Sequence, residues 1–294
     1  MELRVLRYFL AVVREQNITA AAQSLHVTQP TLSKQLMELE DELGTKLFER
    51  GGRSIMLTEE GEYLRRHAQE IVELADKMQA AFRPQGGTLM GDVYIGCGET
   101  PGMRYLIHAM KQVNSRSADV RFHLYSGNDE DVAERLDKGL VDFGLFVGNT
   151  DLNKYDYIRL PSADTWGLLI REDHPLAAKE AITPEDVSGV PLLCSRQSLG
   201  RNELSGWLGR DFRELNILST HNLIGNAVLM VQEGLGCAVT IDGLVNTQRT
   251  GIVFRPFFPR MTAELVVAWK KGQSFSRSAR AFLHCLQETI CKPT

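Results

Sequence analysis

Two helical patterns separated by only two residues constrain the fold more than any other feature of this sequence. The first is the alanine-rich TAAAQSL of residues 19–25, for which Thr19 is the expected N-cap. The second covers residues 28–44, and His26 and Val27 between them leave room only for a tight turn. Two helices joined by so short a turn are typical of a helix-turn-helix.

A further helix is expected before this pair, because apolar residues recur there at helical spacing. Leu6, Phe9, Leu10 and Val13 form its apolar side. In the second helix of the pair, the predicted buried side consists of leucines at spacings of four, three and four, which are Leu32, Leu36, Leu39 and Leu43.

The helix of residues 28–44 has an unusual distribution of polar groups. Amides, hydroxyls and an ammonium lie in its first two turns and carboxylates lie at its end, the reverse of what the helix dipole favours. Thr28 or Gln29 can cap it, and Pro30 suits its first turn. Gly44 is expected to end it.

DNA binding explains this distribution. A recognition helix enters the major groove by its N-terminal end, where amides and hydroxyls meet base edges and phosphate is favoured. The side chains that supply this chemistry are Gln29, Thr31, Ser33 and Lys34. The acidic Glu38, Glu40, Asp41 and Glu42 would be repelled by DNA and must lie beyond the groove. Taken alone, the helices fit a simple three-helix packing unit with a solvated polar face equally well.

A short hairpin is expected directly after the second helix, in residues 46–61. Its turn lies at the glycines of residues 51–52, and its second strand covers residues 54–57. Arg50 and Arg53 flank the turn and would bring cations to the sugar–phosphate backbone or the minor groove. A solvated hairpin would also accommodate both arginines, but the hairpin and the polar helix together favour DNA binding.

A long helix follows, with Thr58 as its expected N-cap and Pro84 beyond its end. Apolar residues alternate in it at spacings of four and three, at Leu64, Ala68, Ile71, Ala75, Met78 and Phe82. This is a heptad seam, as in helices that pair with each other. The chain's own domain could cover such a seam, but its location between two domains favours self-association.

Residues 6–61 resemble the N-terminal domain of the LysR-type transcriptional regulators. The matching motifs are LRYF, the AA pair of the second helix, TQPTLS, LEDELG and LFERGGRSIMLTEEG. The resemblance implies a winged helix-turn-helix whose DNA-contacting residues are Thr28, Gln29, Pro30, Thr31, Ser33, Lys34, Arg50 and Arg53. Family members often carry arginine at the position of Lys34, and lysine lacks the bidentate geometry of arginine. We therefore expect Lys34 to contact phosphate more than a guanine edge.

Strand and helix patterns alternate over residues 91–294, which predicts a parallel α/β sheet. The family resemblance, clearest here in EGLGCAVTI and REDHPLA, implies a two-lobed α/β domain like that of periplasmic binding proteins. The predicted organisation is multidomain: a winged helix-turn-helix domain (1–58), a linker and dimerisation helix (59–87) and an effector-binding domain (91–294), with lobe I at 91–161 and 266–294 and lobe II at 162–265.

Ligands of open α/β sheets bind beyond the carboxyl ends of the strands. The residues at these positions that we select as effector-binding candidates are Glu99, Thr100, Asn128, Phe146, Ser195, Gln197 and Asn222. By resemblance, Thr100 is the family's hydroxyl at the start of the first helix, where free N–H groups would accept a carboxylate. Glu99 would disfavour a simple anion, or would pair with a cationic part of the ligand. Turn or capping chemistry explains the same residues equally well.

Catalysis and cofactor binding have little support in the sequence. There is no nucleotide-binding fingerprint, nucleophile motif or metal-ligand spacing, so we expect no enzyme activity, no cofactor and no metal. The five cysteines are scattered along the chain, so no disulfide framework is expected, and Cys194 is expected to be a buried structural thiol. No segment has the pattern of a secretory signal or membrane span, so a cytoplasmic protein without membrane contact is expected.

The function expected from these features is ligand-controlled transcription regulation. The net charge of −4 means that any DNA-binding surface must be a local basic patch. The resemblance implies inverted-repeat double-stranded DNA, a small-molecule effector, a homodimer or homotetramer, and RNA polymerase as partners. The alternatives are a solute-binding protein, argued from the C-terminal region alone, and an α/β enzyme without DNA-directed function.

Overall fold

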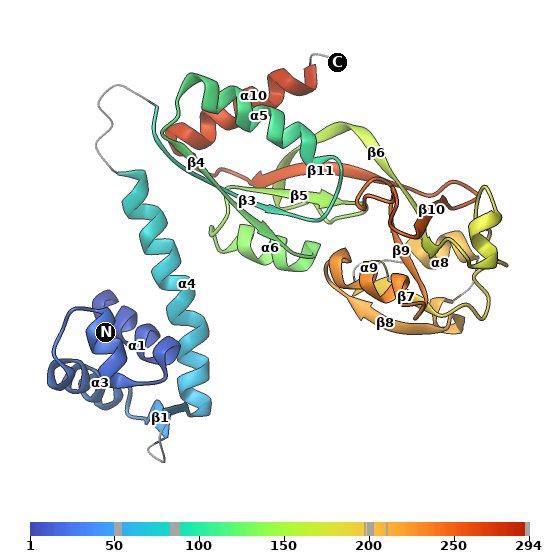
Figure 1. The fold of residues 1–294 in the computed structure, drawn as a ribbon. Coiled ribbons are helices and arrows are strands. Elements are labelled where there is room, and N and C mark those ends of the chain that lie inside the picture. Colours follow the sequence, from blue (N-terminus) through green and yellow to red (C-terminus); the bar gives the residue numbers. More distant parts are fainter. Residues whose placement is uncertain (50–54, 83–88, 197, 199–202, 210, 292–294) are drawn as a thin grey trace. The chain divides into compact units, whose positions relative to one another are not determined.

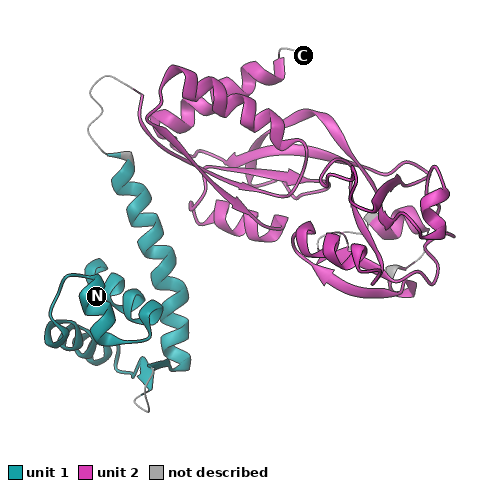
Figure 2. Ribbon diagram, viewed as in Figure 1, with its two compact units in different colours: residues 1–83 teal, residues 84–294 magenta. Residues whose placement is uncertain are grey.

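The computed structural model describes residues 1–49, 55–82, 89–196, 198, 203–209 and 211–291. The chain divides into two compact units, Met1–Arg83 and Pro84–Thr294 (Figure 2). The first unit therefore joins the predicted DNA-binding domain and the long helix, and the second contains the α/β region. No helix in the described ranges is long and apolar enough to cross a membrane.

In its described residues, the first unit contains four helices and a small hairpin (Figure 1). In chain order these are α1 (Leu3–Glu15), α2 (Ile18–Ser24), α3 (Gln29–Leu43), β1 (Phe48–Glu49), β2 (Met56–Leu57) and α4 (Glu59–Ala81). The two strands pair antiparallel, with Phe48 opposite Leu57. Apolar side chains from all four helices form one core, which includes Phe9, Ala21, Leu32, Leu36, Leu39, Leu47 and Ala68.

Two details of this unit differ from the sequence predictions. The N-cap of α2 is Asn17 and not Thr19, because the Asn17 side chain accepts hydrogen bonds from the amides of Thr19 and Ala20 at 2.8 and 3.0 Å. Leu43 is 42% exposed, whereas the other three predicted leucines of α3 are buried. The helix ends at Gly44, whose φ is 69°, and Leu47 beyond it is buried in the core instead.

The predicted seam of α4 divides into a covered part and an exposed part. Ala68 is fully buried in the core of the unit, and Leu64 packs against that core. Farther along the helix, the exposed fractions are 44% for Ile71, 59% for Met78 and 82% for Phe82. Two apolar side chains outside the predicted seam, Tyr63 and Leu74, are also exposed, so one side of α4 is apolar and uncovered in the single chain.

The second unit is built on one mixed nine-stranded sheet (Figure 1). Its strands are β3 (Gly91–Cys97), β4 (Val120–Ser126), β5 (Phe143–Val147), β6 (Tyr155–Arg171), β7 (Leu192–Ser195), β8 (Ile217–His221), β9 (Cys237–Ile241), β10 (Ile252–Pro256) and β11 (Thr262–Lys270). The order is β4-β3-β5-β11-β6-β9-β7-β8, and β10 pairs with β6. The predicted parallel pairing holds for β4-β3-β5 and β9-β7-β8, whereas β6 and β11 pair antiparallel between them.

Helices cover both faces of this sheet. They are α5 (Met103–Arg116), α6 (Asp129–Asp137), α8 (Glu203–Leu208), α9 (Ile224–Gln232) and α10 (Arg277–Cys291), with short 3₁₀ helices at Pro175–Ala178 and Phe212–Glu214. In the half that contains β3, β4 and β5, α5 and α10 lie on one face and α6 lies on the other (Figure 1). In the other half, α9 packs against β6 and β9.

The long strand β6 joins the two halves. Its first part pairs with β11, and its last part pairs with β9 and β10. The register with β11 shifts between Ala163, which faces Glu264, and Arg159, which faces Val266. Pro161 lies within this shift, where its missing N–H does no harm to the ladder. The predicted boundaries between lobe I and lobe II fall within β6 and β11. The positions of these boundaries stay a prediction.

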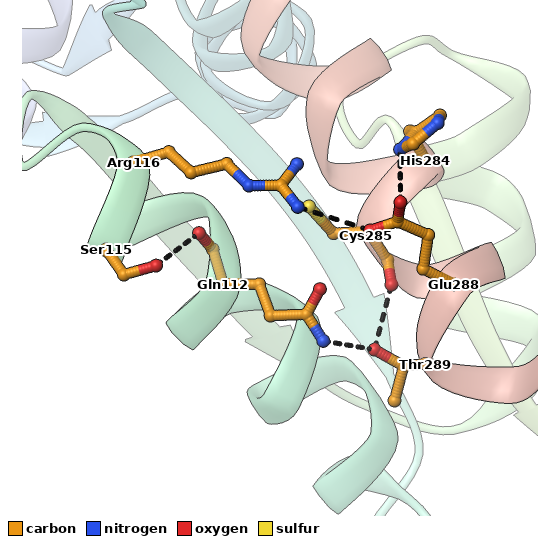
Figure 3. Close-up of polar contacts among 7 residues, drawn as sticks. All are labelled: Gln112, Ser115, Arg116, His284, Cys285, Glu288 and Thr289. Carbon is orange, nitrogen blue, oxygen red and sulfur yellow. Dashed lines mark hydrogen bonds and ion pairs between the residues drawn. The ribbon is translucent and has the colours of Figure 1, made fainter. Parts of the chain in front are cut away.

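The C-terminal helix α10 returns to the first half of the sheet and packs beside α5 (Figure 3). The Gln112 amide donates to the Thr289 hydroxyl at 3.0 Å, and Arg116 donates to Glu288 at 3.2 Å. The Thr289 hydroxyl in turn donates to the carbonyl of Cys285. Because Ser278 at the start of α10 also donates to the carbonyl of Asp92 in β3, the end of the chain completes this half.

Candidate nucleic-acid interface and ligand cleft

The N-terminal end of α3 presents polar side chains to solvent. Thr28 caps the helix, with its hydroxyl accepting from the Thr31 amide at 3.4 Å. Of the predicted DNA-contacting residues in α3 and its cap, Ser33 is half-buried and the others are exposed: Thr28, Gln29, Pro30, Thr31 and Lys34. The buried leucines of α3 thus fix the helix to the core while its first two turns stay accessible.

These exposed groups bond mainly to one another. The Gln29 amide donates to the Ser33 hydroxyl at 2.8 Å, and the hydroxyls of Thr28 and Thr31 lie 2.8 Å apart. The Lys34 ammonium lies 3.7 Å from Glu38, in a pair whose side chains are 73% and 52% exposed. Such an exposed pair contributes little to stability, so phosphate can replace Glu38 as the partner of Lys34 at little cost.

Glu40 differs from the other acidic residues of α3, because it is buried beneath the hairpin and does not face solvent. Its carboxylate accepts from the Leu47 amide at 2.9 Å and from Lys46 at 2.7 Å. Burial opposes ionisation of this carboxyl, but the hydrogen bonds outweigh burial and lower its pKa. The sequence predicted only that Glu40 lies beyond the groove with the other acidic residues, and its burial against Lys46 and Leu47 is added by the structure.

The hairpin is fixed to the helices at its base. The Thr58 hydroxyl donates to the carbonyl of Lys46 at 2.7 Å, and the amide of Ile55 donates to the carbonyl of Gln16 at 3.3 Å. The two predicted wing arginines, Arg50 and Arg53, lie outside the described residues.

A cleft lies between the two halves of the sheet in the second unit, with a volume of about 490 Å³ that includes its open mouth. It is lined by Gly98, Glu99, Gly127 and Val147 from the first half, by Trp166 of β6, and by Ser195, His221, Asn222, Ile224, Val239, Thr240, Ile241 and Leu244 from the second half. Apolar walls with a few polar groups are typical of small-molecule sites.

Three of the seven predicted effector-binding residues line this cleft: Glu99, Ser195 and Asn222. Three others are placed elsewhere, and Gln197 lies outside the described residues. The Asn128 side chain caps α6 by accepting from the Asp131 amide at 2.8 Å. Phe146 is fully buried in the core beneath α6, because neighbouring residues of a strand point to opposite faces and Val147 is the one that reaches the cleft.

Thr100 is buried and already fully hydrogen-bonded. Its hydroxyl donates to Asp164 of β6 and accepts from the Gly102 amide at 2.9 Å. Burial raises the pKa of Asp164, and the hydrogen bond from Thr100 partly offsets this rise. Thr100 therefore holds α5 to β6, and its hydroxyl does not line the cleft.

Glu99 extends from the first half of the sheet to the second. Its carboxylate accepts a hydrogen bond from the backbone N–H of Ile224 at 2.7 Å, at the N-terminus of α9. Leu223 occupies the N-cap position and makes no side-chain cap. Glu99 thus satisfies a helix amide that the α9 segment itself leaves without a side-chain acceptor.

Two cleft residues carry buried polar atoms with no hydrogen-bond partner in the described part of the chain, the Trp166 indole nitrogen and Nδ1 of His221. Trp166 is only 6% exposed, and burial lowers the pKa of His221, which favours its neutral form. His221 ends β8, so its place at the carboxyl end of a strand is a sequence signal for a ligand site. Trp166 lies inside a strand, where no turn residue signals a ligand site.

The cysteines do not form a reactive pair. Cys97, Cys194, Cys237 and Cys285 are buried, and only Cys291 is exposed. Burial raises the pKa of the Cys194 thiol to about 12 and that of Cys237 to about 11. These thiols are protonated at neutral pH and therefore weak nucleophiles.

Two family models match the chain, and together they cover almost all of it. Residues 3–62 match "Bacterial regulatory helix-turn-helix protein, lysR family", and residues 86–290 match "LysR substrate binding domain". The first match covers the helices and hairpin around α3, and the second covers the sheet that contains the cleft.

Curated relatives and solved structures match over nearly their whole length. The "Hca operon transcriptional activator HcaR" of Escherichia coli (strain K12) is 30% identical over 302 residues, covering 100% of both chains. A "Hydrogen peroxide-inducible genes activator" of Escherichia coli O157:H7 is 31% identical over 278 residues, covering 90% of this chain and 89% of the relative.

Among solved structures, full-length CbnR complexed with its target DNA has a TM-score of 0.74 at 19% identity, covering 98% of this chain and 100% of CbnR. Full-length BenM has a TM-score of 0.56 at 23% identity, covering 99% and 96%. At these identities the likeness shows a shared fold. Together with the family matches, it establishes that the chain belongs to the LysR family of DNA-binding transcriptional regulators.

Proposed function

We propose that this regulator binds double-stranded DNA as a dimer and that a small molecule in the cleft of the second unit controls its binding. The observation that carries this proposal is the exposed polar N-terminal end of α3, held by a buried leucine side on a winged helical domain. Amide and hydroxyl side chains at such a helix end suit base edges in the major groove, and the helix dipole favours phosphate there.

The proposed DNA contacts are those of the sequence prediction. Gln29, Thr31 and Ser33 would contact bases, while Lys34 would contact phosphate. Thr28 and Pro30 would shape the first turn that enters the groove. Arg50 and Arg53 are proposed as wing contacts from the sequence pattern.

The exposed side of α4 supports the proposed dimer. Tyr63, Ile71, Leu74, Met78 and Phe82 are all exposed in the single chain. Pairing two copies of α4 would remove this apolar surface from water and would hold two α3 helices on one duplex. A two-fold pair reads an inverted repeat, so we propose an inverted-repeat operator. The homotetramer and contact with RNA polymerase rest on the family resemblance alone.

The cleft is the proposed effector site, with Glu99, Ser195 and Asn222 from the sequence prediction and Trp166 and His221 added by the structure. A ligand that binds one arrangement of the two halves better than another shifts the population toward it. That shift would change DNA affinity or spacing in the dimer, which is a coupling between two separate sites.

Peroxide sensing, which the name of one relative implies for that relative, is not proposed here. Cys194 and Cys237 lie in β7 and β9, are buried, and have raised pKa values. A thiol that reacts readily with peroxide needs an accessible thiolate.

Selection from a random duplex library tests the proposed function. Full-length protein is incubated with the library, and bound duplexes are sequenced after several rounds. The expected result is an enriched inverted repeat with two half-sites at a fixed separation. A population without any enriched motif, or binding that does not require duplex DNA, would contradict the proposal.

A further inference from the structure

Some polar groups of the cleft have hydrogen-bond partners within the chain and others have none. This difference bears on the chemistry of the ligand. This inference rests on the proposed role of the cleft as the effector site. The described lining residues include one carboxylate, Glu99, and neither lysine nor arginine. An anionic ligand would therefore meet a fixed negative charge with no cation among these residues to offset it.

The helix terminus that could have held an anion is already occupied. The first amide of α9, that of Ile224, donates to the Glu99 carboxylate at 2.7 Å. The Thr100 hydroxyl, just before α5, donates to Asp164 and accepts from the Gly102 amide. Both polar features that would bind a ligand carboxylate are thus satisfied by the chain's own groups.

The cleft atoms that lack a hydrogen-bond partner can be satisfied by a neutral ligand group and do not need a carboxylate. The Trp166 indole nitrogen is a donor only and therefore needs an acceptor. Nδ1 of the neutral His221 accepts a hydrogen bond when the ring proton is on Nε2. Glu99 has acceptor capacity beyond its bond to Ile224, since an ionised carboxylate offers about four lone-pair sites.

Burying such atoms without partners is costly, so a ligand that satisfies them gains affinity. The surrounding side chains Val147, Val239, Ile241 and Leu244 offer an apolar wall for the rest of the ligand. A carbonyl oxygen would suit the Trp166 N–H, and an N–H group would suit Glu99 or His221. A carboxamide carries both a carbonyl oxygen and an N–H group, and an amine carries only the N–H group.

We propose that the cleft selects a ligand with an N–H donor head, a carboxamide or an amine, on an apolar body and rejects the corresponding carboxylate. Glu99 is the specificity-determining residue: it occupies the α9 terminus and supplies the negative charge that excludes anions. Trp166 supplies the donor that favours a carboxamide over an amine.

Matched probe molecules test this proposal on the full-length protein. One set is benzoate, benzamide and benzylamine, and the other is hexanoate, hexanamide and hexylamine. Binding is measured by ligand-detected NMR and titration at neutral pH. The expected result is binding of the amide or amine in at least one set, with the acid of that set about tenfold weaker or undetectable.

Three variants assign the selectivity to named residues. Glu99→Gln removes the charge but keeps an acceptor for the Ile224 amide, and Glu99→Ala removes both. We expect the acid to gain about tenfold relative to the amide in Glu99→Gln, and to gain more in Glu99→Ala because the helix amide becomes free. Trp166→Phe keeps a ring without the N–H and is expected to weaken the amide by about tenfold while leaving the amine unchanged.

The proposal is overturned if the acid binds the wild-type protein as tightly as its amide, if the Glu99 variants leave the ratio unchanged, or if no probe of either set binds. Duplex-library binding is measured on the same samples. Protein that selects DNA but binds acids in the cleft would contradict this inference and leave the proposed DNA-binding function standing. Protein that selects no DNA would contradict the function itself.

Discussion

The Glu40 carboxylate accepts a hydrogen bond from the Leu47 amide at 2.9 Å, although seven residues separate them in the chain. This bond joins the last part of α3 to the residue before β1. Lys46 also donates to Glu40, but its side chain is 62% exposed, whereas that of Glu40 is 6% exposed. The hairpin is therefore positioned mainly by the buried bond to the backbone.

We expect Glu40→Ala to lower the free energy of local opening at the junction of α3 and the hairpin by about 1–3 kcal/mol, the usual cost of leaving a buried donor unsatisfied. Hydrogen–deuterium exchange of the Leu47 amide in the full-length protein measures this directly. Lys46→Ala is the matched control and should change exchange by less than about 1 kcal/mol, since it removes only an exposed pair. Equal effects of the two variants would show that the ion pair, and not the backbone bond, holds the hairpin.

The same bond predicts a pH dependence. The folded-state pKa of Glu40 lies below its ordinary value of 4.5, so ionised Glu40 stabilises the folded state. This stabilisation is fully present above pH 4.5 and is lost as the pH falls through the lowered pKa. Leu47 exchange, corrected for intrinsic rates, should therefore lose protection at acidic pH in the wild type but not in Glu40→Gln. Parallel pH profiles in both proteins would contradict this assignment.

In the first unit, features that depend on neighbouring residues could be predicted from the sequence, and features that depend on distant contacts could not. The cap at Thr58 and the helix end at Gly44 depend on neighbouring residues and were predicted correctly, and Thr28 is the cap of the two residues that the sequence left open. Thr19 was predicted as the cap of α2, but Asn17 caps it, since both residue types can cap and the geometry of the turn decides between them. The burial of Glu40 depends on a contact seven residues away and has no signal in helical periodicity.

The cleft was less predictable, because its residues come together from distant strands. The positions at the ends of strands led to three residues that line the cleft, Glu99, Ser195 and Asn222. Phe146 was chosen at the end of a fully buried strand, where no alternation of polar and apolar residues shows which face each side chain takes. Trp166 was missed because it lies inside β6 and not at the carboxyl end of a strand.

Thr100 and Asp164 provide a test in the second unit. Burial raises the pKa of Asp164 above its ordinary value of 3.8, so the folded state binds protons more tightly than the unfolded state. The contribution of Asp164 to the free energy of unfolding therefore falls as the pH rises from 3.8 through its folded-state pKa. Thr100→Val removes the hydrogen bond that favours the ionised form and should deepen this loss by about 1–3 kcal/mol.

Thermal unfolding of the full-length protein between pH 4 and pH 8 measures this effect. Thr100→Ser retains a hydroxyl and is expected to follow the wild-type profile. Thr100→Val should lose more of its melting temperature toward neutral pH than Thr100→Ser does. A valine variant that is uniformly less stable at every pH would indicate a packing effect without any change in the ionisation of Asp164.

The exposed side of α4 predicts the behaviour of charge-introducing variants. Leu74→Glu with Met78→Glu places two carboxylates on this side, whereas Gln69→Glu adds one carboxylate at an exposed position on the opposite side. Each apolar side chain contributes about 1.5–3 kcal/mol when buried and counts twice in a symmetric dimer. Sedimentation equilibrium should show a dimer dissociation constant raised by at least about 100-fold for the double variant and little changed for Gln69→Glu. An unchanged dimer would place the interface elsewhere.

Thiol reactivity tests the assignment of the cysteines. With a pKa of about 12, roughly one Cys194 side chain in 10⁵ is ionised at pH 7, and the residue is fully buried. We expect a thiol-specific reagent to modify Cys291 rapidly and the four buried cysteines only on unfolding. Cys291→Ser should abolish the fast phase. Rapid modification of Cys194 in the native protein would reopen a redox role.

The most direct test of the central claim, that the N-terminal end of α3 reads DNA, is the dissociation constant of the selected duplex at physiological salt. Ser33→Ala with Lys34→Ala is compared with the wild type and with Asp41→Asn, a control at an exposed position near the end of α3. We predict a loss on the order of 100-fold for the double variant, with a weaker salt dependence, and no loss for Asp41→Asn. Wild-type affinity in the double variant would contradict the claim.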